Sequence, residues 1–332
     1  MRAVRAAGLL FGTGLIGVLL GLSAGAEGWS WGWSQWSAEI ELILQLRLPR
    51  TLSAWLAGAA LGLAGAIAQG LFRNPLADPY LLGSAAGAHL AVSLWLSGTS
   101  AWAAAGLLPF ADLASHGLSL PLAAFLGALA GVLCSLVLAG GLREGPVLLL
   151  CGVVVGMLMA AAAEALALIA PEVLRSRQAF LLGTTAFTGP QSVVVLAAAL
   201  VVGLLMALPC ARALDALTLG ESAASTLGLP LRWCRAGLII AMALVTGAAV
   251  AQVGLVGFVG LAAAHVVRTL GAPNHRALLW QSAACGGAML AIADALCRGL
   301  AAPMEWPIGL VTALLGGGYL LFLLRRGSSR SL

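Results

Sequence analysis

Residues 47–79 read RLPRTLSAWLAGAALGLAGAIAQGLFRNPLADP, and no charged side chain falls between Thr51 and Leu71. Crossing the hydrocarbon core of a bilayer takes about 20 predominantly apolar residues in a helix. This stretch has that length, so it predicts a membrane-spanning helix. Small residues recur every four positions along it, a spacing that lets neighbouring membrane helices approach closely. We interpret them as packing positions: Gly58, Gly62, Ala66 and Gly70.

The remaining sequence has the same character. Of its 332 residues, 61% are hydrophobic and 9% are charged, which is more apolar surface than a soluble domain could bury. We therefore predict an all-α fold, a polytopic bundle that forms one transmembrane domain over residues 1–332. The apolar run 6–26 is predicted as the first span, and the alternative for it is a cleaved signal peptide. Polar breaks divide the chain into ten spans: 6–26, 51–71, 81–98, 119–140, 147–169, 190–209, 233–252, 255–270, 278–297 and 307–324.

Positive charge is distributed unevenly over the predicted connections. All 17 basic residues are arginine. If the N-terminus is cytoplasmic, 12 of the 17 lie in inside connections, as expected when positive loops stay inside. Both termini are then cytoplasmic, and the basic balance needs no nucleic-acid partner. The five outside arginines are Arg47, Arg50, Arg175, Arg177 and Arg298.

The residue types present exclude several kinds of chemistry. A P-loop ATPase needs a lysine to reach the phosphates, and this chain has none. No HExxH motif occurs, and the six cysteines lack the spacing of a metal site. We therefore expect no catalytic residue, no metal site and no permanently bound cofactor. Any ATP-driven step would need a second polypeptide.

The longest predicted inside connection, about 211–232, contains a short amphipathic stretch from Leu219 to Leu229. Glu221, Ser222 and Ser225 form its polar face. A glycine followed by Leu-Pro ends it, as is common beyond a helix C-terminus. A small helix at the cytoplasmic surface, between the sixth and seventh predicted spans, suggests a contact site for a partner. The alternative is an interfacial linker helix.

Several motifs occur in order between Leu46 and Arg326. They are RLPR at 47–50, QGLFRNPLADP at 69–79, LGE at 219–221, LGLP at 227–230, GFVGL at 257–261, His265, NHR at 274–276, AD at 293–294 and PIGLVT at 307–312. In these motifs the chain resembles the FecCD-type permeases of type II ABC importers, which serve ferric siderophores, haem and vitamin B12.

The resemblance implies a homodimer of ten-helix subunits in the bacterial inner membrane, surrounded by lipid. Two ABC ATPase subunits, which hold ATP and magnesium, would lie below it and a periplasmic binding protein above. The coupling residues would be Leu219, Gly220, Glu221, Ser225, Leu227, Gly228 and Leu229. Arg47, Arg50 and Arg298 would dock the binding protein. The alternative for Arg47 and Arg50 is that they reach the lipid headgroups.

The substrate pathway is predicted around the fifth span. Glu164 lies within it. Because burying its charge in lipid is costly, an intramembrane carboxylate indicates a functional site. Arg175 and Arg177 follow it and could receive carboxylates such as haem propionates. Phe180 and His265 complete the predicted set. Metal handling by His265 or His89 is possible, although we favour a packing role for both histidines.

The chain departs from the family pattern in three places. Family members usually have proline at the position of Ala264, many have tryptophan at that of Phe180, and Gly316-Gly317-Gly318-Tyr319 replaces a more usual Gly-Ala-Pro-aromatic stretch. By the resemblance, each departure lies near an element that moves during transport or lines the pathway. The cargo therefore stays open at this point.

The expected function is import of an iron chelate, haem or a corrinoid, with haem favoured, by alternating access. A first alternative is an ion-coupled secondary transporter with Glu164 or Asp294 as the proton carrier. A second alternative is a membrane enzyme.

Overall fold

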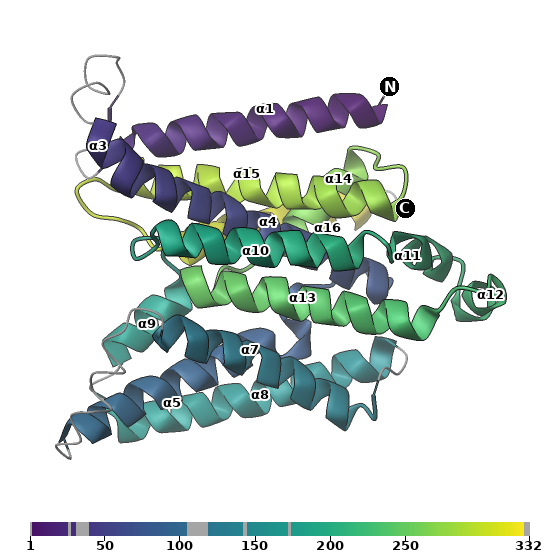
Figure 1. Cartoon of the computed structure of the whole chain (residues 1–332), viewed down its shortest axis with the longest axis horizontal. Coiled ribbons are helices and arrows are strands. Elements are labelled where there is room, and N and C mark those ends of the chain that lie inside the picture. Colours follow the sequence, from purple (N-terminus) through teal and green to yellow (C-terminus); the bar gives the residue numbers. More distant parts are fainter. Residues whose placement is uncertain are drawn as a thin grey trace.

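The structure, a computed structural model, describes residues 2–25, 28–30, 40–104, 119–141, 145–171 and 174–328. This part is almost entirely helical (Figure 1). Its sheet is a two-stranded antiparallel hairpin in which β1 (Ala24–Gly25) pairs with β2 (Gly28–Trp29). The predicted all-α fold class is confirmed.

Within the described residues, nine long helices form the bundle: α1 (Arg2–Ser23), α4 (Leu48–Leu71), α5 (Ser84–Ala104), α7 (Ser119–Leu138), α8 (Gly145–Ile169), α10 (Pro190–Ala207), α13 (Leu231–Val253), α15 (His275–Ala301) and α16 (Ile308–Ser328). The short helices are α3 (Ile40–Leu42), α9 (Leu174–Leu182), α11 (Ala211–Leu217), α12 (Glu221–Thr226) and α14 (Val259–Thr269). A π-helical segment (Ile43–Arg47) leads into α4, and a 3-10 turn (Pro79–Leu82) precedes α5.

Six continuous helical segments of the described residues are long and apolar enough to cross a membrane. They are Ile40–Leu71, Ser119–Leu138, Pro146–Ile169, Pro190–Ala207, Leu231–Val253 and His275–Ala301.

Helix α4, which contains the stretch quoted first, lies at the centre of the bundle. Of the 18 most hydrophobic consecutive residues in the helical segment Ile40–Leu71, 83% are buried. A Cβ atom on Gly58 would lie 2.2 Å from the Gly286 carbonyl oxygen of α15, and one on Gly62 would lie 2.1 Å from that of Ser282. No side chain fits in such gaps, so the two helix backbones touch there. The packing interpretation of Gly58 and Gly62 is confirmed.

The eighth predicted span, 255–270, is wrong as a complete helix. Helix α14 begins only at Val259, because Gly254 (φ 72°) and Phe258 (φ 67°) place left-handed backbone after α13. Its 11 residues would cover about 16 Å at 1.5 Å per residue, roughly half the hydrocarbon thickness. The apolar composition of this stretch reflects burial among α4, α15 and α16.

The two ends of the bundle differ (Figure 1). At one end, called here the α12 end, α11 and α12 project beyond the long helices. Helix α1 begins and α16 ends near this same end. The other, the α9 end, carries α9 and the loops that follow α9 and α15. Two of the arginines counted for the membrane orientation, Arg143 and Arg330, lie outside the described residues.

Large apolar side chains cover the outer faces of α8 and α10. On α8 the exposed side chains include Leu150, Met157, Leu158 and Leu168. Only 22% of the 18 most hydrophobic consecutive residues in Pro146–Ile169 are buried. Apolar surface of this extent needs a cover of lipid or protein.

Candidate functional site

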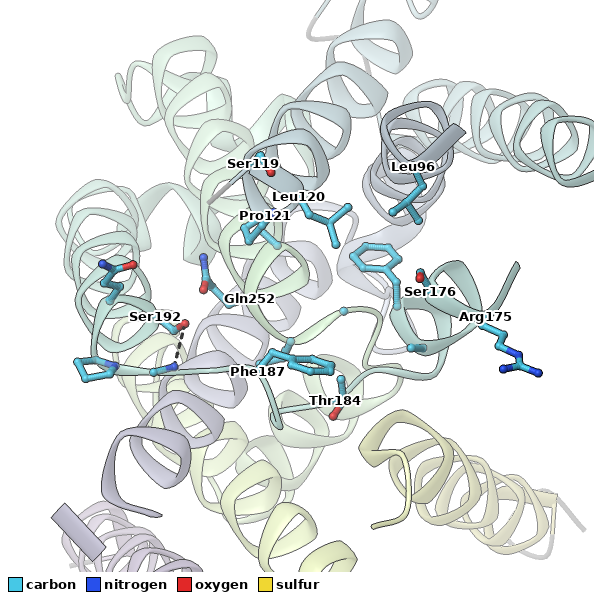
Figure 2. A pocket seen from close by; sticks show the side chains of 18 residues that line it. Leu96, Ser119, Leu120, Pro121, Arg175, Ser176, Thr184, Phe187, Ser192 and Gln252 are labelled. Carbon is cyan, nitrogen blue, oxygen red and sulfur yellow. Dashed lines mark hydrogen bonds between the residues drawn. The ribbon is translucent and has the colours of Figure 1, made fainter. Parts of the chain in front are cut away.

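A cavity of about 990 Å³ opens at the α9 end between α5, α7, α9, α10 and α13. Figure 2 shows Leu96, Leu120 and Phe187 around it, whereas the Arg175 guanidinium points away. The polar lining consists of neutral hydroxyl and amide groups, including Ser176, Thr184 and Gln252. A wall that is largely apolar with a few neutral polar groups suits a large, mostly apolar ligand.

Two glycines shape the backbone beside this cavity. Gly183 (φ 67°) ends α9 and Gly254 (φ 72°) ends α13. A Cβ on Gly254 would lie 2.5 Å from the Phe180 carbonyl oxygen. The close approach lets Leu255 N donate to Phe180 O (3.0 Å) and Thr184 N donate to Val253 O (2.9 Å). Helix α9 is thereby joined to the break between α13 and α14.

The predicted pathway residues do not form one cluster. Arg175 and Phe180 line the cavity. Glu164 and Arg177 pair with each other, and Arg177 Nε also donates to His89 Nε2 of α5 (2.8 Å). Arg177 is buried, with 3% of its surface exposed. In this arrangement Arg177 is not free to receive cargo, because a carboxylate of the chain already pairs with it, and its role in the pathway stays a prediction.

His265 lies in a third place, between α14 and α16. Its ring meets Tyr319 edge to face at a centroid distance of 5.8 Å. Its Nδ1 has no hydrogen-bond partner within the part of the chain that the structure describes. Two of the family departures belong to this region: Ala264 is fully buried, and a Cβ on Gly316 would lie 2.3 Å from Phe258 Cβ. The glycine makes room for a phenylalanine held in left-handed backbone.

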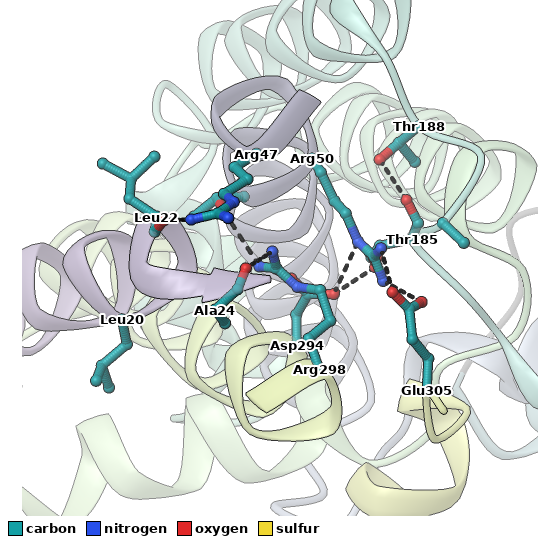
Figure 3. A network of polar contacts seen from close by, with 12 residues as sticks. Leu20, Leu22, Ala24, Arg47, Arg50, Thr185, Thr188, Asp294, Arg298 and Glu305 are labelled. Atoms are coloured by element: carbon teal, nitrogen blue, oxygen red, sulfur yellow. Dashed lines mark hydrogen bonds and ion pairs between the residues drawn. The ribbon is translucent and has the colours of Figure 1, made fainter. Parts of the chain in front are cut away.

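A chain of alternating charges ties together the loops at the α9 end (Figure 3). Arg298 pairs with Asp294 (2.5 Å), and Arg50 Nε lies 3.7 Å from Asp294. Arg50 also holds Glu305 through two hydrogen bonds (2.9 and 2.8 Å). This pairing lowers the pKa of Glu305 below its usual value. Thr185 bonds to both Arg50 and Asp294.

The predicted docking arginines all make internal contacts. Arg298 is 3% exposed and donates to Ala24 O (3.0 Å), so it does not lie open at the surface of this chain, and its docking role stays a prediction. Arg47 is half-buried and donates to Leu22 O (3.3 Å) and Ser30 Oγ (2.7 Å). Arg50 keeps 16% of its side chain exposed, beside the more open Glu305. The spacing of arginines in the sequence does not show that Arg47 and Arg298 contact the end of α1 and the hairpin that follows it.

The helix in the predicted coupling stretch is shorter than expected, and an ion pair joins its first residue to the bundle. Helix α12 covers Glu221–Thr226, and Gly220 (φ 101°) and Gly228 (φ 68°) bound it. Glu221 pairs with Arg235 of α13. Ala224 packs against Ala216 and Leu217 of α11, whereas Leu219 and Leu227 are 70% and 57% exposed. The projecting helix pair therefore presents apolar side chains, Leu219 and Leu227, that the described residues leave uncovered.

Sequence reasoning missed four residues of these clusters as partners: His89, Thr185, Asp294 and Glu305. His89 had a signal, since it is the one histidine of the third span, but nothing in the sequence paired it with Arg177. The described residues hold no group of three His, Cys, Asp or Glu side chains that could bind a metal ion.

A bundle of apolar helices with a cavity at one end and a projecting helix pair at the other is the architecture of a membrane transport subunit. The sequence matches the FecCD transport family over residues 10–326. The chain belongs to this family, and it is an ABC importer permease.

Three relatives illustrate the similarity. The chain is 38% identical over 288 residues to the hemin transport system permease protein of Yersinia pestis, covering 85% of this chain and 83% of the relative. It is 38% identical over 320 residues to the vitamin B12 import system permease protein of Salmonella paratyphi A, covering 95% and 93%. A solved structure described as an inward-facing metal-chelate type ABC transporter aligns with a TM-score of 0.81 at 26% identity, covering 97% and 99%.

Proposed function

We propose that two copies of this chain form the membrane channel of an importer for a large metal chelate of the haem, corrinoid or ferric siderophore class, with haem the first to be tested. The importer lies in the bacterial inner membrane with both termini of the chain in the cytoplasm. A periplasmic binding protein delivers the cargo at the α9 end, and two ABC ATPases act at the α12 end.

The cavity at the α9 end is the observation that carries the cargo class. Its volume of about 990 Å³ and its apolar walls suit a large macrocycle. The relatives named for hemin and for vitamin B12 have cargoes of this kind. A cargo with charged edges would leave its carboxylates toward the mouth, where Arg175 lies, because the other lining residues are uncharged.

The energy for transport comes from the partner ATPases. The exposed Leu219 and Leu227 on the projecting pair α11–α12 would enter an apolar groove of the ATPase. Ser225 and the Gly228–Leu229 stop lie on the same projection. A push on this pair would reach the bundle through the Glu221–Arg235 ion pair to α13.

Docking of the binding protein is proposed at the α9 end, with Arg50 and Glu305 as the contact pair and Arg47 as a support of the neighbouring hairpin. Both side chains of the contact pair remain partly exposed. An incoming carboxylate would compete with Glu305 for Arg50, and such rim pairs mainly set encounter rate and orientation.

Reconstitution tests the function. The chain and its ATPase would be placed in proteoliposomes with the loaded binding protein, and uptake of haem, cyanocobalamin and a ferric siderophore would be followed by absorption. We expect ATP-dependent uptake of one of the three. Uptake that persists without the ATPase would support the secondary transporter instead, and ATP-dependent uptake of none of them would refute the cargo class.

A further inference from the structure

Helix α9 is held in the bundle by a charged side chain. It has nine residues, fewer than an isolated helix needs to be stable in water. Arg177 is its one buried residue. A buried arginine is rare unless it is paired, and here it anchors the helix together with the backbone bonds at Phe180 and Gly183.

The partners of Arg177 come from two different long helices. Its Nε donates to Nε2 of His89 on α5, at 2.8 Å. One terminal nitrogen pairs with the Glu164 carboxylate of α8. The bond from Nε requires an unprotonated Nε2 on His89, so the imidazole acts as an acceptor here. The three side chains join α5, α8 and α9 at a single point.

Helix α9 also forms one wall of the cavity. Arg175, Ser176, Ala179 and Phe180 line it. The backbone oxygen of Phe180 accepts a hydrogen bond from Leu255 N, and that of Gly183 accepts one from Ile308 N at 3.2 Å. A movement of α9 would therefore change the cavity wall and reach the starts of α14 and α16.

The ion pair is strong enough to hold α9 and weak enough to release it. The Glu164 side chain is 64% exposed on the surface of the single chain. Where the proposed pathway between two copies brings water to this surface, water or a ligand can compete for the carboxylate. Exposed pairs contribute about 1 kcal/mol or less. On the other side, Nη1 of Arg177 has no hydrogen-bond partner within the described part of the chain. The guanidinium is thus not fully satisfied in this arrangement.

From these contacts we infer that Glu164, Arg177 and His89 form a latch that holds α9 against α5 and α8 and keeps the cavity wall closed. Release of the Glu164 carboxylate lets the N-terminal part of α9 move away from α8, while the backbone bonds at Phe180 and Gly183 hold its other end, and this movement widens the mouth at the α9 end. Arg177 acts as a positioning residue, through α9, and it does not touch the cargo. The inference goes beyond the proposed function because it holds for any cargo.

Opening of the cavity can be measured without cargo. The test uses the full chain assembled with its ATPase in proteoliposomes, with its six cysteines replaced and one cysteine introduced at Gln252, a half-buried lining residue of α13. A membrane-impermeant maleimide reports its accessibility. We expect Arg177→Gln and Glu164→Gln each to raise the labelling rate roughly fivefold, equivalent to about 1 kcal/mol.

The control is Gln178→Ala on the same helix. Gln178 is exposed and does not line the cavity, so its replacement should leave labelling unchanged. His89→Gln keeps an acceptor and should label more slowly than His89→Leu.

The charge-swapped pair Glu164→Arg with Arg177→Glu should bring the rate back toward that of the parent chain. A general loss of structure would not be repaired by the swap. Unchanged labelling in Glu164→Gln would overturn the latch, as would a swap that labels as fast as either single variant. If Arg177 variants fail to assemble, Glu164→Gln decides, since its side chain is mostly exposed and its loss leaves the fold intact.

Discussion

Replacing Asp294 by alanine tests whether the charge network at the α9 end is structural. Asp294 is 1% exposed and Arg298 is 3% exposed. Removing one member of a buried ion pair costs about 3–5 kcal/mol, because the other charge stays buried without its partner. Arg298 would keep Ala24 O (3.0 Å) and Thr51 Oγ1 (3.3 Å) as neutral acceptors. We therefore expect a loss near the lower end of the range, about 3 kcal/mol.

Thermal unfolding in detergent measures this loss. At about 2.1 cal/mol/K per residue, a chain of 332 residues has an unfolding entropy of about 0.7 kcal/mol/K, so about 3 kcal/mol lowers the midpoint by about 4 °C. The shift is larger if only part of the chain unfolds. The double variant Asp294→Ala with Arg298→Ala should lose less than Asp294→Ala alone, since no unpaired charge remains.

Two outcomes would contradict this reasoning. A midpoint within 1 °C of the parent would mean that the pair contributes nothing to stability. A fully stable Asp294→Ala variant whose uptake loses its pH dependence would instead support the alternative in which Asp294 carries protons. The surface variant Glu305→Ala serves as a control, because its partner Arg50 is nearer to solvent and the expected cost is below about 1 kcal/mol.

Three further predictions concern other parts of the chain. Gly62→Val should destabilise the fold by at least about 1–3 kcal/mol in a thermal melt, because its Cβ meets the Ser282 oxygen, whereas Gly317→Val, with no atom within 4 Å, should not. Glu221→Gln should free α12 from Arg235 and lower the amount of ATPase that co-purifies, while Ser222→Ala, exposed on the same helix, should leave it unchanged; equal recovery would refute the coupling role. Because Arg50 lowers the pKa of Glu305, their pair stabilises the fold above the ordinary value of 4.5 and loses this effect as pH falls below it. The midpoint difference between the parent and Glu305→Gln should therefore shrink as the pH falls below 4.5, and a constant difference would contradict the assignment.

The spans could be predicted because they depend on local composition, and the family because its motifs can be read directly from the sequence. An uncharged run such as Thr51–Leu71 must avoid water wherever it lies, and the small residues along it pack against whichever helix comes near. The sequence did not predict that α14 is a half-length helix. Its apolar residues satisfy a hydropathy pattern equally well in lipid or inside the protein, and the left-handed Phe258 that delays its start has no sequence signal.

The partners of charged residues were harder to predict. Arg298 was placed on an outside loop from topology alone, but it lies at the end of α15, where the hairpin after α1 covers it. Arg177 and His89 are 88 residues apart in the chain. A single sequence gives the residue types of such a cluster but not the helix packing that brings them together.

The charge network and the proposed latch are joined by one short segment. Gly183 ends α9, and two residues later Thr185 bonds to both Arg50 and Asp294. Between them, Thr184 N donates to Val253 O at the end of α13. If a binding protein competes with Glu305 for Arg50, the bond from Arg50 Nε to Thr185 must adjust, and the displacement reaches α9 within two residues. Docking at the rim and opening of the cavity wall would then be coupled along the backbone. On this reasoning Thr185→Val, which removes both hydrogen bonds and keeps the shape of the side chain, should leave cavity labelling near the parent rate without the binding protein but abolish any increase that its arrival produces.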